Sequence, residues 1–362
     1  MSFEKFINQE LTGWMVAKGE HSDIVLSTRI RLARNLQSQL FPICASAEDA
    51  KQVNEAVDQA VSSMEELHFA GTSMSDLTLL ERQILVEKHL VSPQLINPEK
   101  YGSVLLSEDE TISIMVNEED HIRIQCIYPG FQIEKAYEQA DKVDSEIENN
   151  LDYAFDETFG YLTSCPSNTG TGMRASVMMH LPALTITKQI ERIVPAISRL
   201  GMVVRGSYGE GSEALGNIYQ ISNQTTLGKS EEEVLKDLEN ISKRLIGHEK
   251  KSRELLLAKS QVHLENRLYR SLGTITHARI LPTAEAARCL SDVRLGIDLD
   301  IIKNIDMTIL NELMIFMQPG FLQQYAGTEL TSDERDVFRA QLFRDRLSIE
   351  RSQTAESDTN ET

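Results

Sequence analysis

The chain lacks the features that mark membrane, secreted and disulfide-rich proteins. It has four cysteines in 362 residues, and no two of them have the CxxC spacing of a zinc ribbon, so neither paired-cysteine zinc nor a disulfide scaffold is expected. No apolar run approaches the roughly 18 residues of a membrane-spanning helix, and the first residues carry no basic segment followed by an apolar core. We therefore expect a reduced, soluble, cytoplasmic protein.

Basic residues are also scarce. The 36 lysines and arginines are outnumbered by 55 acidic residues, which leaves a formal charge of −19. Such a surface repels nucleic acid and attracts arginine-bearing partners. If the chain binds anionic molecules, its arginines must be gathered in one place. The eight histidines fall at no metal-ligand spacing such as HExxH, so no metal held directly by the protein is expected.

The first two-thirds of the chain mix helix and strand patterns. Residues 47–67 and 78–91 have the periodicity of helices, whereas residues 112–116 and 122–126 alternate in the way that strands do. The polar connection between these two strands is of hairpin length, which predicts antiparallel pairing. The fold class expected from these patterns is α+β, an antiparallel β-sheet flanked by helices.

The pattern changes at Ser230. A capping box formed by Ser230 and Glu233 opens a run of apolar residues at helical spacing, and helical patterns continue to about Arg346. The final residues are polar and carry no apolar anchor, which is typical of disorder. We predict a catalytic domain at 1–228, a helical C-terminal domain at 229–350 and a disordered tail at 351–362.

Four separated segments concentrate arginines and carboxylates. They are residues 27–31 (STRIR), 117–123 (NEEDHIR), 165–174 (CPSNTGTGMR) and 205–210 (RGSYGE). A strand through the first segment would place Arg29 and Arg31 on one face. Each segment alone is typical of solvated charges and polar turns. Together, their five arginines could converge on a polyphosphate, because guanidinium groups bind phosphate oxygens in pairs and stay charged.

The same segments could serve phosphoryl transfer, which needs positive donors on the developing charge and in-line positioning. Glu119 and Glu210 stand at turns beside arginine-bearing strands, where they could orient a cationic acceptor such as a guanidinium. With a pKa above about 12, that acceptor must be held while it loses a proton. Either glutamate could be the base. Cys165 beside the cation would be favoured as a thiolate, in a role that is either essential or merely helpful.

In this order, the four signatures resemble those of the guanidino-kinase (phosphagen kinase) family, over about residues 20 to 230. The resemblance implies that the chain uses ATP, with Mg²⁺ bound mainly through the nucleotide phosphates and water. It implies catalytic roles for Glu119, Glu210 and Cys165. It also implies nucleotide contacts, most of them within the signatures, by Ser27, Thr28, Arg29, Ile30, Arg31, His89, Arg123, Arg174, Ala175, Ser176, Val177, Met178, Arg205, Gly206, Ser207, Tyr208, Gly209 and Glu210.

Departures from the family pattern point to one of its branches. Small-molecule members carry a helical domain before the catalytic region, and that domain supplies the loop that closes on the substrate. Here the first signature begins at Ser27, which leaves no room for it. Met178 stands where those members typically have histidine, and Tyr208 where an arginine is common. We expect an open site that accepts arginine within a polypeptide, as in the branch of the family that phosphorylates proteins.

A further signature lies near the end of the chain. Residues 335–340 (RDVFRA) match the RDxxRA pattern with which that branch binds phosphoarginine allosterically. In such a site Arg335 and Arg339 pair with the phosphoryl group, Asp336 accepts the guanidino N–H groups, and Ala340 completes the signature. The alternative is a charged helix face with intrahelical ion pairs, each worth about 0.2–0.5 kcal/mol. The kinase signatures upstream favour the pocket.

The function expected is that of a transferase, an ATP-dependent kinase of arginine residues in proteins that marks them for Clp-type proteolysis in a stress response. The resemblance implies protein substrates with exposed arginine, a zinc-binding activator protein, a Clp-type unfoldase and a homo-oligomer, without nucleic acid or membrane. Two alternatives stay open, a kinase of free arginine or another small guanidine, and a phosphoarginine-binding adaptor. The sequence does not identify the target arginines, the number of subunits or the need for an activator.

Overall fold

The computed structural model describes the chain except for residues 1–2, 10, 17–18, 98–100, 207–213 and 359–362. It divides into two compact units. The first unit comprises Met1–Met178, Val194–Val204 and Gln220–Lys243, and the second comprises Met179–Ile193, Arg205–Tyr219 and Arg244–Thr362. The chain crosses from the first unit to the second for the last time after Lys243. The sequence pattern, in comparison, predicts a domain boundary at 228.

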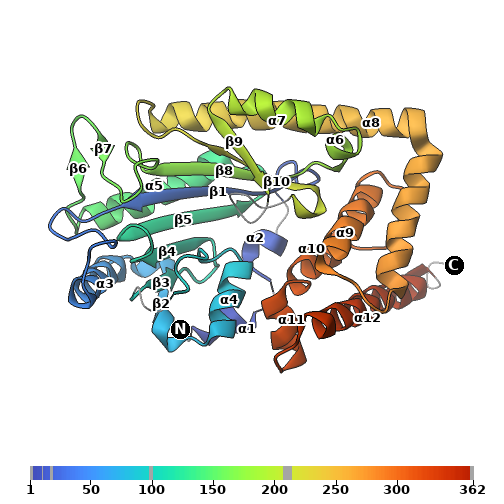
Figure 1. The fold of residues 1–362 in the computed structure, drawn as a ribbon, viewed down its shortest axis with the longest axis horizontal. Coiled ribbons are helices and arrows are strands. Elements are labelled where there is room, and N and C mark those ends of the chain that lie inside the picture. The colour runs from blue at the N-terminus through green and yellow to red at the C-terminus, as the bar shows by residue number, and fades with distance from the viewer. Residues whose placement is uncertain (1–2, 10, 17–18, 98–100, 207–213, 359–362) are drawn as a thin grey trace. The chain divides into compact units, whose positions relative to one another are not determined.

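An antiparallel β-sheet dominates the first unit (Figure 1). Its eight strands lie in the order β2-β3-β4-β5-β1-β8-β10-β9. The pairing predicted for the two neighbouring strand patterns is confirmed, with Ile114 opposite Ile124. The strands are β1 (Val25–Arg34), β2 (Ala70–Ser73), β3 (Ser103–Leu106), β4 (Ile112–Val116), β5 (Ile122–Pro129), β8 (Met173–His180), β9 (Met202–Gly206) and β10 (Ile218–Asn223), and a separate hairpin pairs β6 (Phe155–Asp156) with β7 (Gly160–Tyr161).

Helices begin in the first unit where the sequence offers caps. Capping boxes at Ser46 and Thr78 start α3 and α4, which confirms the two helices predicted there. Both are shorter than their patterns: α4 ends before His89, whose φ of 60° cannot continue a right-handed helix. The helices are α1 (Glu4–Asn8), α2 (Gly13–Val16), α3 (Ala47–Ser62), α4 (Leu79–Glu87) and α5 (Ile133–Glu148), with 3₁₀ turns at Glu65–Leu67 and Met74–Asp76, and α7 (Ile190–Ser198) belongs partly to this unit.

One face of the sheet is closed by α5, which packs against β1 and β5. Alternation along β1 sends Ile30 and Leu32 to this face, where both are buried. Arg34 points the same way and forms a buried ion pair with Asp144 of α5, with Nη2 and Oδ2 separated by 2.6 Å. The opposite face therefore receives the alternate residues of β1, among them Arg29 and Arg31.

The second unit is helical. Its core includes the buried side chains of Leu268, Leu290, Leu313 and Phe343. Its helices are α6 (Pro182–Ile186), α9 (Thr283–Asp298), α10 (Met307–Phe316), α11 (Pro319–Ala326) and α12 (Ser332–Asp358), together with a 3₁₀ turn at Leu215–Asn217 and most of α8 (Glu231–His277). No helix among the described residues is long and apolar enough to span a membrane.

The tail expected at 351–362 stays a prediction. Helix α12 continues to Asp358, and residues 359–362 lie outside the described residues. The helix contains neither proline nor glycine between Ser332 and Asp358, so no residue in that stretch terminates it. A polar composition lowers the gain from burial, but it does not by itself break a helix.

Candidate active site

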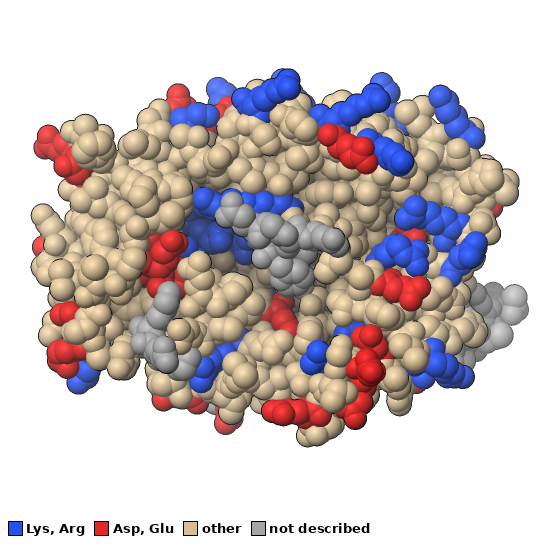
Figure 2. Space-filling view, viewed as in Figure 1, with Lys and Arg blue, Asp and Glu red and all other residues tan. Residues whose placement is uncertain are grey.

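Arginines from three neighbouring strands gather on the open face of the sheet. Arg29 and Arg31 come from β1, Arg123 from β5 and Arg174 from β8, and all four belong to the first unit. In the register of β1 and β5, Arg31 lies opposite Gln125 and Ala33 lies opposite Arg123, so these side chains share a face. Basic side chains collect in a recess of the molecular face in Figure 2.

The electrostatics of these arginines show that they are close and partly dehydrated. Burial lowers the pKa of Arg29 to about 10, with further lowering by the charges of Arg123 and Arg174. Burial, followed by the charges of Arg29, Arg123 and Arg174, holds the pKa of Arg31 well below its ordinary value. Nη2 of Arg29 donates to Oε1 of Gln220 at 3.0 Å, and Nε of Arg31 is buried without a hydrogen-bond partner among the described residues. Such a cluster attracts an anion with several charges.

His89 lies beside this cluster. Burial, followed by the positive charge of Arg29, lowers its pKa to about 3, so the imidazole is neutral at physiological pH. Its ring stacks at an angle on Trp14, with ring centroids 5.8 Å apart, and its backbone carbonyl accepts from Nε2 of Gln125 at 2.8 Å. A neutral ring held on the arginine face is suited to an uncharged partner such as a purine base.

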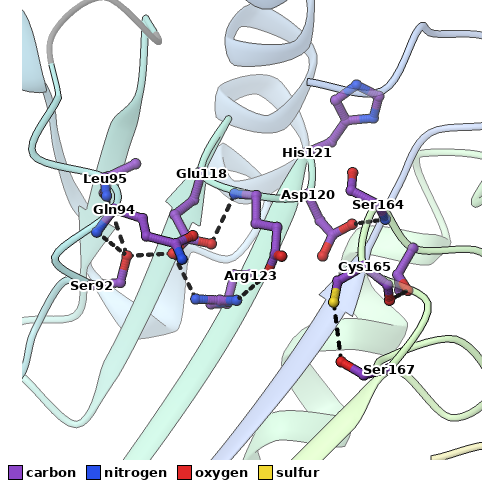
Figure 3. Close-up of polar contacts among 12 residues, drawn as sticks. Ser92, Gln94, Leu95, Glu118, Asp120, His121, Arg123, Ser164, Cys165 and Ser167 are labelled. Carbon is purple, nitrogen blue, oxygen red and sulfur yellow. Dashed lines mark hydrogen bonds and ion pairs between the residues drawn. The ribbon is translucent and has the colours of Figure 1, made fainter. Parts of the chain in front are cut away.

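The turn before β5 carries two glutamates with different surroundings. Glu118 is buried, and its Oε1 lies 2.7 Å from Nη1 of Arg123 and accepts from Oγ of Ser92 (Figure 3). Glu119 is more open, with a side-chain exposure of 30%, and its Oε2 lies 3.2 Å from Nη2 of the same arginine. The turn is fixed by Asn117, whose left-handed φ of 55° asparagine tolerates better than most residues.

The loop that carries Cys165 approaches the same turn. Oδ1 of Asp120 accepts from the backbone N–H of Ser164 at 2.6 Å, which connects the turn to the residue beside Cys165. The thiol is half-buried, and its Sγ lies 3.1 Å from Oγ of Ser167. The hydroxyl of Thr226 fixes the far side of the loop by donating to the carbonyls of Ser167 and Thr169.

The other residues of β1 and β8 that are predicted to contact the nucleotide fall into two groups, because side chains alternate between the two faces of a sheet. Ser27 on β1 and Ser176 and Met178 on β8 share the parity of the arginines on their strands. The side chains of opposite parity, which point away from the arginine face, are those of Thr28, Ile30, Ala175 and Val177. The hydroxyl of Thr28, for example, donates to the carbonyl of Gly130 at 2.7 Å. Any contact from them to a ligand on the arginine face would use the backbone.

The last signature is only partly described. Arg205 and Gly206 end β9 and belong to the second unit. Ser207, Tyr208, Gly209 and Glu210 lie outside the described residues. Of the two glutamates predicted to be catalytic, Glu119 is therefore the one among the described residues.

In the second unit, the RDxxRA residues do not share one exposed surface. Arg339 is buried, and it donates from Nε to the Met317 carbonyl at 2.9 Å and from Nη1 to the Leu281 carbonyl at 2.8 Å. The same Nη1 lies 2.5 Å from Oδ1 of Asp336. Ala340 is also buried, whereas Arg335 is partly exposed and donates to the Leu330 carbonyl at 3.3 Å. In this arrangement Arg339 supports the helix packing, and Arg335 is the arginine open to a ligand.

The sequence motifs do not single out several polar residues that contact the site. Glu118 is the carboxylate that holds Arg123, although the sequence gives it no priority over its neighbour. Asp120 and Gln220 contact site segments that are far away in the chain. The one available signal was local: Glu118 and Asp120 flank Glu119 in the same acidic turn.

The sequence matches a protein family over most of the first unit. Residues 52–252 match the family described as ATP:guanido phosphotransferase, C-terminal catalytic domain, and residues 261–358 match the protein-arginine kinase McsB C-terminal domain. The chain also resembles the crystal structure of lombricine kinase, with a TM-score of 0.57 and 26% identity over 66% of this chain and 69% of that one. The antiparallel sheet, its arginine face and these matches define the class of the protein, an ATP:guanido phosphotransferase.

Relatives of similar length narrow the class. The chain is 57% identical over 352 residues to the protein-arginine kinase of Halalkalibacterium halodurans, covering 97% of this chain and 99% of the relative. It is 55% identical over 361 residues to the protein-arginine kinase of Geobacillus sp. (strain WCH70), covering 99% and 100%. The chain therefore belongs to the protein-arginine kinase family.

Proposed function

We propose that this chain transfers the γ-phosphoryl group of ATP to the guanidinium of arginine residues in proteins. The observation that carries the proposal is the convergence of Arg29, Arg31, Arg123 and Arg174 on one sheet face, next to the turn that holds Glu119. A cationic cluster suits the polyphosphate of the nucleotide, and an adjacent carboxylate suits a cationic acceptor. The names of the relatives supply the acceptor's identity, arginine in a protein.

The proposed reaction is an in-line displacement. The bond between the γ-phosphorus and the bridging oxygen breaks, a P–N bond forms to the guanidino nitrogen, and ADP leaves. The arginine face stabilises the charge that spreads over the transferring group. The acceptor must lose one N–H proton, and Glu119 or Glu210 takes it. Glu119 is the more available glutamate of its turn, because Glu118 is committed to Arg123 and Ser92.

Cys165 is proposed to lie on the acceptor side. A thiolate there would be favoured by the guanidinium and would help to hold it. Its neighbour Ser167 offers a hydroxyl at 3.1 Å that can donate to the sulfur. Cys165 would thus act by electrostatics rather than by forming a covalent bond.

Magnesium is proposed to enter on the nucleotide. No group of three or more His, Cys, Asp or Glu residues within the described part of the chain could hold a metal ion. The side chains facing the proposed phosphates are cationic, so they suit phosphate oxygens and not a divalent cation. When bound, Mg²⁺ would neutralise charge on the phosphates and orient them.

We further propose the wider role that the family suggests. The enzyme would act in the cytoplasm during stress and mark proteins for Clp-type proteolysis, with a zinc-binding activator as partner and a homo-oligomeric assembly. Phosphoarginine bound at the RDxxRA segment would regulate it allosterically, with Arg335 as the accessible contact.

A transfer assay tests the proposal. Radiolabelled ATP with Mg²⁺ is incubated with an unfolded arginine-rich protein and, in parallel, with free L-arginine, and the product is tested for the acid lability of an N–P bond. Acid-labile label on the protein alone is expected. Label on free arginine would instead establish a small-molecule kinase. ATP binding without transfer to either acceptor would favour a phosphoarginine-binding adaptor or a required activator.

Variants then identify the base. Glu119→Gln and Glu210→Gln are each expected to keep ATP binding, and the one that removes the base should lose transfer. Wild-type turnover in either variant would remove that glutamate from the mechanism.

A further inference from the structure

Asn35, the residue after β1, uses all the polar groups of its side-chain amide to join the end of β1 to two other segments. It is buried, with 1% of its surface exposed. Its Nδ2 donates to Oδ1 of Asp120 at 2.7 Å and to the carbonyl of Leu162 at 3.0 Å, and its Oδ1 accepts from the backbone N–H of His121 at 2.9 Å. One acceptor and two N–H donors are the polar groups of an asparagine side chain, and all of them are engaged.

The segments that Asn35 joins are the two on which the acceptor side of the site depends. Asp120 and His121 belong to the turn that carries Glu119. Leu162 belongs to the loop that leads to Cys165. Asp120 completes the junction, because the same Oδ1 that accepts from Asn35 also accepts from the Ser164 backbone at 2.6 Å (Figure 3). Asp120 is fully buried, so water does not compete for these bonds.

The junction fixes the position of Glu119 relative to Cys165. Without Asn35, the turn and the loop would keep the hydrogen bond from Ser164 to Asp120 but lose the three bonds of the amide, so their separation would be fixed less tightly. Geometry of this kind matters for transfer, because a misplacement of about 1 Å can lower a rate about 100-fold. The ATP side depends less on it, since the arginines are placed by the register of β1 with β5 and by the position of β8 next to β1.

We propose that Asn35 is a positioning residue for phosphoryl transfer: through Asp120, His121 and Leu162 it holds the Glu119 turn and the Cys165 loop at a fixed separation. It touches neither ATP nor the acceptor. The proposal rests on the function proposed above and adds a residue that the four signatures do not include.

The first test uses Asn35→Ala in the full-length protein. We expect kcat for transfer to protein arginine to fall about 100-fold, while KM for ATP stays within about twofold. A second readout needs no activity: alkylation of Cys165 by iodoacetamide, followed by peptide mass spectrometry, with the exposed Cys44 of the same molecule as reference. Release of the loop should raise the ratio of Cys165 to Cys44 modification by about threefold or more.

Asn54→Ala is the matched control. Asn54 lies on α3, where its amide donates to the Tyr101 carbonyl and accepts from the Ser103 hydroxyl. The variant also removes an asparagine with hydrogen bonds at both ends of its amide, but far in sequence from the turn and the loop. Its transfer rate and alkylation ratio should match those of the wild type.

A second pair of variants, in which the side chains at positions 35 and 120 are exchanged, separates a loss of positioning from a simple loss of folding. Asn35→Asp places two buried carboxylates together and should lose transfer. The double variant Asn35→Asp/Asp120→Asn removes this repulsion and restores a donor and an acceptor between the two positions. The Leu162 carbonyl and the Ser164 N–H lose their partners in it, because Asn35 and Ser164 donate to the same Oδ1 of Asp120. We expect the double variant to recover transfer at least tenfold over the single one.

Two outcomes overturn the proposal: a kcat for Asn35→Ala within twofold of the control, or an unchanged alkylation ratio. Absence of transfer by the wild type would overturn the proposed function instead, and the alkylation ratios would still show whether the junction holds the loop.

Discussion

The carboxylate of Glu118 and the guanidinium of Arg123 form a shielded ion pair, with Oε1 and Nη1 separated by 2.7 Å. Glu118 has no exposed side-chain surface and Arg123 retains 14%. The pair fixes one arginine of the arginine face and leaves the adjacent Glu119 partly exposed. Two consecutive glutamates thus have different surroundings in the candidate site.

Removing Glu118 should therefore affect folding more than removing its neighbour. For Glu118→Ala we expect the free energy of unfolding to fall by about 3 kcal/mol, because a buried charge loses its principal partner. Glu119→Ala, at a more exposed pair, should change it by less than about 1 kcal/mol while reducing transfer. Urea unfolding of both variants measures the difference. Equal losses of stability would contradict the division of roles.

The arginine cluster should cost stability in the free enzyme. Burial and the charges of neighbouring arginines lower the pKa of Arg31, which means that its charged form is disfavoured in the folded state. Arg31→Met should raise the free energy of unfolding by about 1 kcal/mol and weaken ATP binding at least about tenfold, a trade-off of stability against function. Urea unfolding and ATP titration check the two halves. A variant that is less stable than the wild type would refute the first.

Acid should destabilise the protein in part through His89. Its folded pKa of about 3 lies below the ordinary value of 6.5, so between these values the unfolded chain binds a proton that the folded chain does not. This contribution to stability is present above pH 6.5 and is lost as the pH falls toward 3. His89→Asn, which suits the left-handed backbone there, should reduce the pH slope of unfolding free energy by up to about 1.4 kcal/mol per unit. His68→Asn removes an exposed histidine that also has a left-handed backbone, and it serves as the control for the substitution itself.

Substitution of the two arginines of the RDxxRA segment should have different effects, on stability for Arg339 and on phosphoarginine binding for Arg335. Arg339→Ala leaves the buried carbonyls of Met317 and Leu281 without their donor, which should cost about 3 kcal/mol of stability. Arg335→Ala should change stability by less than about 0.5 kcal/mol and abolish phosphoarginine-peptide binding. Thermal unfolding and peptide titration test both. Normal stability of Arg339→Ala would show that its hydrogen bonds are dispensable.

Local pattern predicted those parts of the site that depend on strand alternation. The shared face of Arg29 and Arg31 follows from a period of two, and the β4–β5 pairing follows from a short polar connection. The distinction between Glu118 and Glu119 could not be predicted, because it depends on a turn that contains a left-handed asparagine. Asn35 was missed because its partner Asp120 lies 85 residues away. The burial of Arg339 was missed because a charged residue on a helix is usually solvated, and because its carbonyl partners lie in distant connections, Leu281 between α8 and α9 and Met317 between α10 and α11.

The sheet that assembles the site also sets when it can form during synthesis. Arg29 is made early, yet its hydrogen-bond partner Gln220 follows 191 residues later, and the first unit requires residues up to 243. Such distant pairings close slowly, because the entropy of a long loop is lost before the contact is gained. A nascent chain that stops short of β10 would therefore hold its arginine strands without the complete sheet. This protein should acquire nucleotide binding late in translation, and truncated products should lack it.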